Sequence, residues 1–261
     1  MEKVKLMMHN NIATLEIANP PVNALSKQVT DELLEHLESL AENPEVRVLL
    51  IKGAGEKAFM AGADIKEFPN VMNQTKTGEV TKFVLKSHSM YNNLANFPKP
   101  TIAILNGMAL GGGCELALAC DIRIAAEEVQ LGLPEIKLGI FPGGGGTQRL
   151  PRLIGPSKAK MLMFSGNPIT AEEAYRIGLV DDVIPAIDLH EKAIELAEGI
   201  SSRPGVGLRL IKKLVNRGLE LPLEEALRLE AEYFESVLNT EDAHEGVEAF
   251  LEKRQPQFKH M

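Results

Sequence analysis

Three consecutive glycines that lead into a run of helix-forming residues constrain this chain more than any other feature. Gly111–Gly113 follow Thr101–Leu105, a run typical of a buried strand, and precede the helix-favouring stretch Cys114–Cys120. Glycine has no Cβ, so the backbone N–H groups of such a turn can come close to a ligand. Because a helix N-terminus leaves N–H groups unpaired and its dipole favours negative charge, we expect a turn that stabilises an anion.

A carboxylate stands among apolar residues just after this turn. Glu115 falls in the first turn of the predicted helix, with Leu116 and Leu118 beside it. A second glutamate, Glu135, follows Pro134 at a bend one helix and one strand later. Read alone, Glu135 is more typical of an N-cap or first-turn acid after Pro134. Two carboxylates in one apolar pocket can divide acid and base roles, because burial and mutual repulsion separate their pKa values.

The same order of strand, small-residue loop and helix also occurs earlier in the chain. A buried strand is predicted at Val46–Lys52, a loop of small residues at Ala58–Lys66 and a long helix at Val80–Phe97. The loop also fits a tight turn with Asp64 as a helix N-cap. The polar stretch Phe68–Gly78 is predicted to form a lid or wall of a site. The repetition favours related layers stacked side by side.

The remaining segments predict a mixed α/β chain that becomes helical toward its C-terminus. Ser26 is a predicted helix N-cap, with an apolar stripe after it. Further strands are predicted at Val4–Met8, Ile12–Ile17, Ile122–Ala125 and Val180–Ile184. Helical periodicity marks Ser157–Ser165, Thr170–Ile177, Asp188–Ser201, Gly205–Arg217, Leu223–Leu238 and Glu241–Arg254.

A second glycine run, Gly143–Gly146, has two interpretations. Four glycines before a helix could cradle a phosphate, but no lysine follows at the P-loop spacing. The alternative is a structural bend with a ligand nearby, and we favour this alternative.

Composition and charge exclude several classes of protein. The 261 residues carry 28 basic and 36 acidic side chains, a net charge of −8, without a dense basic cluster, which argues against binding to nucleic acids or anionic membranes. No apolar stretch is typical of a signal peptide or a membrane span, so a cytoplasmic location is expected. The two cysteines, Cys114 and Cys120, point to opposing sides of a helix and are expected to stay reduced. HExxH and CxxC motifs are absent, so no metal site is expected.

Three linked motifs carry a resemblance to a known family. FMAGADIKEF (Phe59–Phe68), NGMALGGGCELALACDIRIAA (Asn106–Ala126) and LGLPEIKLGIFPGGGGTQRLPRLIG (Leu131–Gly155) resemble, in order and spacing, the enoyl-CoA hydratase branch of the crotonase superfamily. The similarity extends over essentially the whole chain, including Ala171–Asp181.

This resemblance implies a fold and an assembly. The fold would be a crotonase spiral of repeated ββα units that form two roughly perpendicular sheets. Residues 1–199 would be the core domain with the active site, and residues 200–261 a helical trimerisation region. The chain would form a homotrimer, or a homohexamer built from two trimers.

The resemblance also implies site residues and a reaction. Glu115 and Glu135 would be catalytic, and the backbone N–H groups of Ala61 and Gly112 would form an oxyanion hole for the thioester oxygen. Residues implied in substrate or CoA binding are Ala61, Gly62, Ala63, Asp64, Ile65, Lys66, Gly111, Gly112, Pro134 and Gly143. The expected reaction is the reversible syn addition of water to a 2-trans-enoyl-CoA, as in fatty acid β-oxidation, without a cofactor other than the CoA of the substrate.

Three alternatives stay open at this point. An enoyl-CoA isomerase would need only one proton-shuttling group, so the presence of two glutamates favours hydration. Another acyl-CoA lyase of the superfamily is the second alternative. A non-catalytic relative that binds CoA thioesters or RNA is the third, and the negative net charge disfavours RNA.

Overall fold

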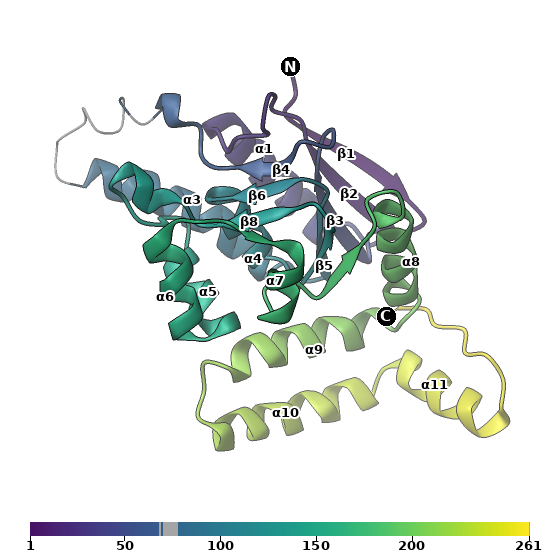
Figure 1. The fold of residues 1–261 in the computed structure, drawn as a ribbon. Coiled ribbons are helices and arrows are strands. Elements are labelled where there is room, and N and C mark those ends of the chain that lie inside the picture. Colours follow the sequence, from purple (N-terminus) through teal and green to yellow (C-terminus); the bar gives the residue numbers. More distant parts are fainter. Residues whose placement is uncertain (68, 70–77, 261) are drawn as a thin grey trace.

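The protein is described by a computed structural model that covers residues 1–67, 69 and 78–260. Two β-sheets form its centre, and helices surround them (Figure 1). The larger sheet has the strand order β1-β2-β3-β5-β7-β10, with β1 antiparallel to β2 and the other pairs parallel. Its strands are β1 (Val4–His9), β2 (Ile12–Ile17), β3 (Val48–Gly53), β5 (Thr101–Leu105), β7 (Ile122–Ala126) and β10 (Asp182–Ile184).

The smaller sheet consists of four short strands. Its order is β4-β6-β8-β9, in which the first three strands are parallel and β9 is antiparallel to β8. The strands are β4 (Ala58–Ala61), β6 (Met108–Leu110), β8 (Gln130–Gly132) and β9 (Ile169–Thr170). None of these strands was predicted from the sequence, because two to four residues are too few to show an alternating pattern.

Helices follow the strand pairs and cover the sheets. Ser26 caps the first helix as predicted, since its Oγ accepts a hydrogen bond from the N–H of Val29. The described helices of the core are α1 (Lys27–Glu42), η1 (Ile65–Glu67), α3 (Glu79–Ala95), α4 (Gly112–Leu118), η2 (Glu135–Leu138), α5 (Gly146–Ile154), α6 (Pro156–Ser165), α7 (Ala171–Arg176) and α8 (Leu189–Ser201). Among the described helices, none has the length and apolar character that a membrane span requires.

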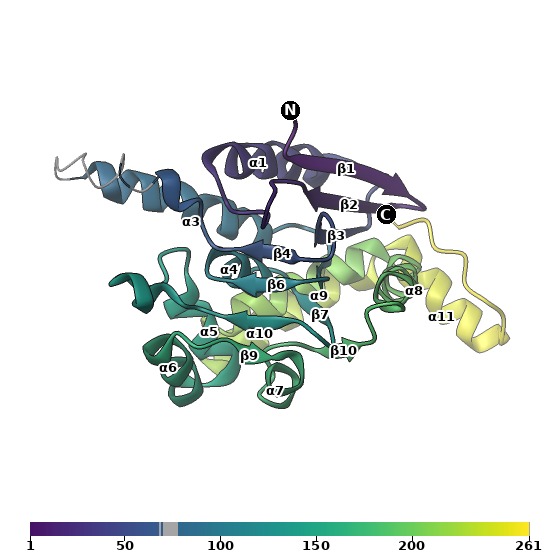
Figure 2. The same cartoon turned by 45° about the horizontal axis from the view of Figure 1, so that its top comes forward.

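A ββα unit recurs three times along the chain, as β3–β4–α3, β5–β6–α4 and β7–β8–α5. In each unit the first strand joins the larger sheet and the second joins the smaller sheet, so equivalent strands lie side by side (Figure 2). Parallel strands covered on both faces are apolar along their length, and β5 is buried at every residue. The expectation of repeated ββα units in two sheets is confirmed. The predicted lid at Phe68–Gly78 lies, except for residues 69 and 78, outside the described residues.

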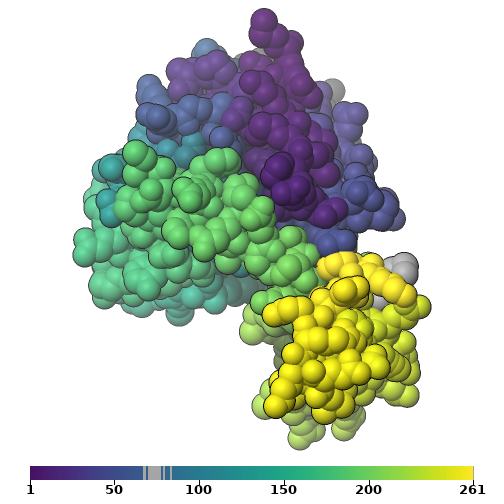
Figure 3. All heavy atoms as spheres, turned by 90° about the vertical axis from the view of Figure 1, so that its right-hand side faces the viewer, coloured from purple at the N-terminus to yellow at the C-terminus, as the bar shows by residue number. Residues whose placement is uncertain are grey.

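The C-terminal helices project away from the sheets (Figures 1 and 3). They are α9 (Gly205–Gly218), α10 (Leu223–Leu238) and α11 (Glu241–Glu252), close to the predicted bounds. An ion pair of 2.8 Å between Lys212 on α9 and Asp121 connects them to the core. A domain boundary at residue 199 would fall in the last turn of α8, so the change in architecture comes just after it. The division into domains stays a prediction.

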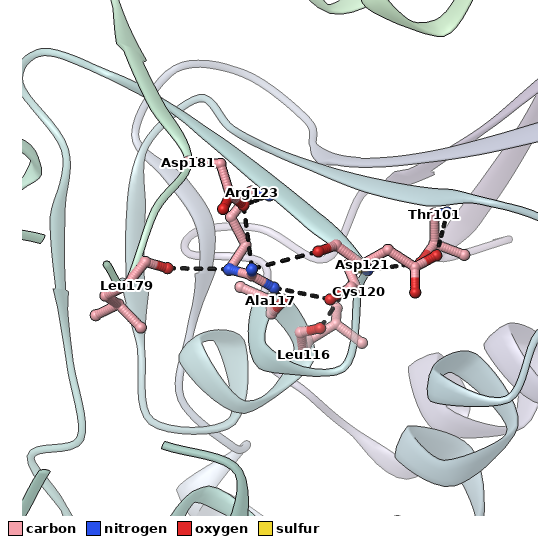
Figure 4. Close-up of polar contacts among 8 residues, drawn as sticks. All are labelled: Thr101, Leu116, Ala117, Cys120, Asp121, Arg123, Leu179 and Asp181. Carbon is pink, nitrogen blue, oxygen red and sulfur yellow. Dashed lines mark hydrogen bonds and ion pairs between the residues drawn. The ribbon is translucent and has the colours of Figure 1, made fainter. Parts of the chain in front are cut away.

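A buried arginine fixes the carboxyl end of α4, the helix that starts at the glycine turn. Arg123 is only 5% exposed, and its guanidinium donates hydrogen bonds to the carbonyl oxygens of Leu179 at 2.9 Å and Cys120 at 2.8 Å (Figure 4). The same group pairs with Asp181 at 3.1 Å. Cations are favourable where a helix leaves carbonyl groups unpaired. Arg123 therefore holds α4 against the bend that leads into β10.

Replacing Arg123 with Met is expected to lower the free energy of unfolding by about 3–5 kcal/mol, because buried carbonyls and Asp181 lose their donor. The matched control is Arg176→Met, which removes an exposed ion pair with Glu173 within one helical turn and should leave the unfolding midpoint nearly unchanged. Urea unfolding at equal protein concentration measures both variants. Equal unfolding midpoints for the two would contradict the assigned role of Arg123.

Candidate active site

The glycine turn follows β6 of the smaller sheet, and its geometry requires glycine. Gly111 has a φ of +55°, which few residues with a side chain adopt. A Cβ on Gly113 would overlap the carbonyl oxygen of Met60 in β4. The N–H of Gly111 donates to the carbonyl oxygen of Gly132 in β8 at 2.9 Å. The turn is thus fixed between β4 and β8, with Gly112 as the first residue of α4.

The structure corrects the predicted role of Ala61 as an oxyanion-hole donor. Its N–H donates to the carbonyl oxygen of Val22 at 3.0 Å, so this group is not free to bind a substrate oxygen. The prediction that Ala61 supplies half of the oxyanion hole is therefore wrong. The sequence does not show this, because the bond joins Ala61 to backbone 39 residues away in the chain, outside the pairing of β4 with β6.

Ala63 occupies the position expected for that donor. The carbonyl of Gly62 and the N–H of Asp64 both bond the backbone of Leu25, at 2.9 and 2.8 Å. The carbonyl of Gly62 and the N–H of Ala63 belong to one trans peptide group and point in opposite directions, so the N–H of Ala63 faces away from Leu25. It lies 3.7 Å from the point where a Cβ on Gly112 would be. The backbones of Ala63 and Gly112 are therefore neighbours.

Glu115 is held by the second glycine run. Its side chain is 4% exposed, and its Oε1 accepts hydrogen bonds from the N–H groups of Gly144 at 2.7 Å and Gly146 at 2.8 Å. Burial raises the pKa of Glu115, and these two backbone donors oppose that increase. Both donors favour the ionised form of the carboxyl group.

The run Gly143–Gly146 therefore binds a carboxylate of the chain itself. A Cβ on Gly144 would overlap Oε2 of Glu115 and the ring of Tyr91, and a Cβ on Gly146 would lie 3.0 Å from Oε1 of Glu115. Glycine is needed at both positions because the carboxylate lies directly on the backbone. The expectation of a structural bend, rather than a phosphate cradle, agrees with this use of the N–H groups.

Glu135 approaches the same turn from η2. Its Oε1 lies 2.9 Å from the point where a Cβ on Gly111 would be, and its Oε2 is buried without a hydrogen-bond partner among the described residues. Burial raises the pKa of Glu135 to about 7, and the negative charge of Glu115 adds to the increase. At neutral pH Glu135 thus retains a proton for a large part of the time, whereas Glu115 has two donors that favour its charge.

The other predicted binding residues lie around this centre. Gly62 packs against Gly111, with its Cα 3.3 Å from the point where a Cβ would be. Asp64 Oδ1 accepts from the N–H of Lys66 at 3.1 Å at the start of η1. Ile65 and Lys66 are exposed there, Pro134 directly precedes Glu135, and Gly143 begins the loop under Glu115. Contacts of these residues with a substrate stay predictions.

Three residues that sequence reasoning did not select also contact the site. Tyr91 is fully buried and its hydroxyl donates to the carbonyl oxygen of Gly112 at 3.1 Å. His88 contacts the carbonyl oxygen of Gly143 at 2.6 Å, and Arg149 donates to that of Gly144 at 3.3 Å. The signal was present for α3, since His88 and Tyr91 are three residues apart and share a helix face. The carbonyl oxygens that they contact, however, belong to residues far away in the sequence, so the spacing alone does not reveal these contacts.

Neither cysteine is part of this chemistry. Cys114 and Cys120 are buried and unpaired, and burial raises the pKa of each thiol to about 12. Such thiols are almost entirely protonated at neutral pH and are poor nucleophiles. In the described part of the chain, no cluster of three His, Cys, Asp or Glu side chains has the arrangement of a metal site.

Two sheets of repeated ββα units thus bring together a backbone donor turn and two glutamates, an arrangement suited to an enzyme that stabilises a developing negative charge while it transfers protons. Comparison with known proteins agrees: the chain matches the enoyl-CoA hydratase/isomerase family over residues 7–261, and it belongs to this family.

Individual relatives are similar over their full lengths. The chain is 40% identical over 258 residues to a crotonyl-CoA hydratase of Syntrophomonas wolfei, covering 98% of each protein. It is 42% identical over 260 residues to a probable enoyl-CoA hydratase of Bacillus subtilis, covering 99% of each. The crystal structure of an enoyl-CoA hydratase from Bacillus anthracis superposes with a TM-score of 0.93 at 41% identity, covering 99% of this chain and all of that one. The crotonase fold is thus confirmed.

Proposed function

We propose that this protein is an enoyl-CoA hydratase that adds water reversibly to a 2-trans-enoyl-CoA and forms the 3-hydroxyacyl-CoA. The observation that carries the proposal is the pairing of a buried glutamate, Glu115, with a half-buried one, Glu135, in different environments beside one donor turn. Relatives named as hydratases at about 40% identity over the full chain support it.

In this mechanism Glu115 acts as the base and Glu135 as the acid. Glu115 takes a proton from a water molecule, whose oxygen forms a bond to C3 of the substrate. The electron pair of the C2–C3 double bond moves onto the thioester oxygen and gives an enolate. Glu135 then donates its proton to C2, and the carbonyl is restored. The proton that Glu115 took from water returns to Glu135 before the next turnover, so the pair regains its starting state. Because both carboxyl groups lie beside the glycine turn, on one side of the substrate, the hydrogen and the hydroxyl add to the same face.

We assign the oxyanion hole to the N–H groups of Gly112 and Ala63. The first is supported by its place at the start of α4, where N–H groups have no partner within the helix. The second is supported by its orientation away from Leu25 and its proximity to Gly112. One such donor typically contributes about 3–4 kcal/mol to stabilisation of the transition state.

An assay with four substrates tests the proposal. Crotonyl-, hexenoyl- and decenoyl-CoA are followed by loss of the absorbance of the conjugated thioester, and a 3-enoyl-CoA is followed by its gain. A hydratase consumes at least one 2-enoyl substrate and forms the 3-hydroxy product. Turnover of the 3-enoyl-CoA alone would instead identify an isomerase, which needs only one of the two glutamates.

The pair of glutamates should give a characteristic pH profile. The active form holds one proton on the pair, so kcat/KM is expected to fall about tenfold per pH unit above pH 7, where Glu135 loses that proton. The overall reaction releases no proton, so its equilibrium constant does not depend on pH. The profiles measured with enoyl-CoA and with 3-hydroxyacyl-CoA must therefore coincide. A hydration rate that stays constant between about pH 6 and 9 would contradict the role of the pair.

We further propose that the chain forms a homotrimer or a hexamer of two trimers through its C-terminal helices. These helices expose many large apolar side chains in the single chain, which is unusual for a free surface. They include Ile211, Val215, Leu219, Leu223, Leu227, Phe234, Leu238, Val247, Phe250 and Leu251. Sedimentation equilibrium should give three or six times the chain mass of 28.5 kDa. A monomer at micromolar concentration would contradict the proposal.

The remaining expectations concern partners and location. No cofactor beyond the CoA of the substrate is proposed, because the two glutamates supply both proton transfers. A net charge of −8 supports the absence of nucleic acid among the partners. A cytoplasmic location, a role in β-oxidation and the preferred acyl-chain length stay predictions.

A further inference from the structure

One face of α3 is directed at the backbone of the active site. His88, Tyr91 and Asn92 have the spacing i, i+3, i+4 and therefore lie on the same side of this helix. Tyr91 donates to the carbonyl oxygen of Gly112. Asn92 accepts from Arg149 at 2.7 Å, and the same guanidinium donates to the carbonyl oxygen of Gly144. His88 contacts the carbonyl oxygen of Gly143 at 2.6 Å.

The contact of His88 is of particular interest because of the peptide group that it reaches. The carbonyl of Gly143 and the N–H of Gly144 belong to one peptide unit, which is planar and rigid. The carbonyl end of this unit contacts Nε2 of His88, and the N–H end donates to Oε1 of Glu115 at 2.7 Å. Since a carbonyl oxygen can only accept, Nε2 of His88 carries the hydrogen. A chain of two hydrogen bonds thus runs from His88 through one peptide to the carboxylate.

The glycine loop needs such an external support. Glycine has a wide range of backbone conformations, so a run of four glycines does not by itself fix the direction of an N–H group. Residues with a side chain would restrict the backbone conformations of the loop, but the carboxylate of Glu115 leaves no space for a Cβ at Gly144. The orientation of the N–H groups of the loop must therefore be fixed by groups outside the loop that donate hydrogen bonds to its carbonyl oxygens.

We infer that His88 is a positioning residue for the reaction: its ring N–H fixes the Gly143–Gly144 peptide and thereby aims the Gly144 N–H at the Glu115 carboxylate. The inference rests on the proposed hydratase function, in which Glu115 is the base. Hydrogen bonds in a chain also polarise one another, so the His88 contact strengthens the donor that reaches Glu115. His88 touches neither substrate nor water in this role.

Loss of this support should affect the chemical step more than substrate binding. Without His88, the Gly144 N–H is free to turn away and Glu115 keeps only the donor of Gly146. The ionised form of Glu115 then becomes less favourable. The other titratable groups around Glu115 stay in place in such a variant; they are Glu135, Arg149, Tyr91 and Cys114. The acid limb of the pH profile should therefore move to higher pH, because the base takes up a proton earlier.

The test compares three variants with the wild type on crotonyl-CoA. His88→Leu removes the donor and should lower kcat about tenfold with KM nearly unchanged, which corresponds to one ordinary hydrogen bond. His88→Gln retains an N–H at nearly the position of Nε2 without a positive charge, and it should recover kcat to within about threefold of the wild type. The matched control is His36→Leu: the half-buried His36 makes the same kind of contact, at 3.2 Å to the carbonyl oxygen of Val4, away from the site.

The outcomes separate this inference from the proposed function. A wild type that hydrates no enoyl-CoA contradicts the function itself. A wild type that is active, with His88→Leu equally active, overturns the role of His88 alone. The inference also fails when His88→Gln is as impaired as His88→Leu, or when His36→Leu lowers kcat to the same extent. A low kcat in His88→Leu, recovery in His88→Gln and a displaced acid limb support it.

Discussion

Replacing Glu115 with Gln is expected to lower kcat for hydration by about 10²–10⁴-fold, the range typical for loss of a positioned proton-transfer group. Gln has nearly the shape of Glu, and its amide oxygen can still accept from the N–H groups of Gly144 and Gly146. The loop and the pocket should therefore remain in place and KM should change little. What the variant lacks is the ability to take a proton from water.

Stability provides the control for this variant. Burial raises the pKa of Glu115 in the folded state, so its stabilising contribution is present at low pH and is lost as the pH rises through the folded pKa. At neutral pH the neutral Gln side chain should leave the free energy of unfolding unchanged or higher. A large loss of activity together with a large loss of stability would indicate a structural role for Glu115 instead.

Replacing Gly144 with Ala is expected to have the second-largest effect. The new Cβ would overlap both the Glu115 carboxylate and the ring of Tyr91, and neither buried side chain has room to move away. The loop must withdraw, which removes the Gly144 N–H from Glu115. A displacement of about 1 Å at a catalytic group can lower kcat about 10²-fold. Overpacking should also destabilise the protein by about 1–3 kcal/mol.

Gly199→Ala is the matched control for this substitution. Gly199 lies in α8 with no atom within 4 Å of a new Cβ, so Ala should preserve kcat and slightly stabilise the helix. Steady-state kinetics and urea unfolding distinguish the two variants. A Gly144→Ala protein with the kcat of the wild type would show that the orientation of Glu115 does not depend on this loop.

The sequence predicts the larger sheet and the helices because these elements carry long periodic patterns. Strand β5 reads as an unbroken apolar run, and the helices from α6 onward show helical spacing over ten or more residues in most cases. The smaller sheet could not be predicted in this way. Strand β4, for example, has only the four residues Ala58–Ala61, which are typical of part of a loop when read alone. Such segments become strands because neighbouring units supply the hydrogen-bond partners.

For the site, the sequence locates the two glutamates but not their surroundings. Glu115 stands out because a carboxylate is rare in an apolar helix. Its partners, the N–H groups of Gly144 and Gly146, are 29 and 31 residues away, and no local pattern marks such a contact. The error at Ala61 has the same origin, since only tertiary pairing with Val22 shows that its N–H is already engaged.

The most direct test of the central claim follows both atoms of the added water. Crotonyl-CoA is incubated with the wild type and with Glu115→Gln in D₂O enriched in ¹⁸O, and the product is analysed by mass spectrometry. Joint action of the two glutamates predicts 3-hydroxybutyryl-CoA with one deuterium at C2 and one ¹⁸O at C3, formed at least about 10²-fold faster by the wild type. Equal rates for the two proteins, or deuterium at carbon without ¹⁸O, would contradict it.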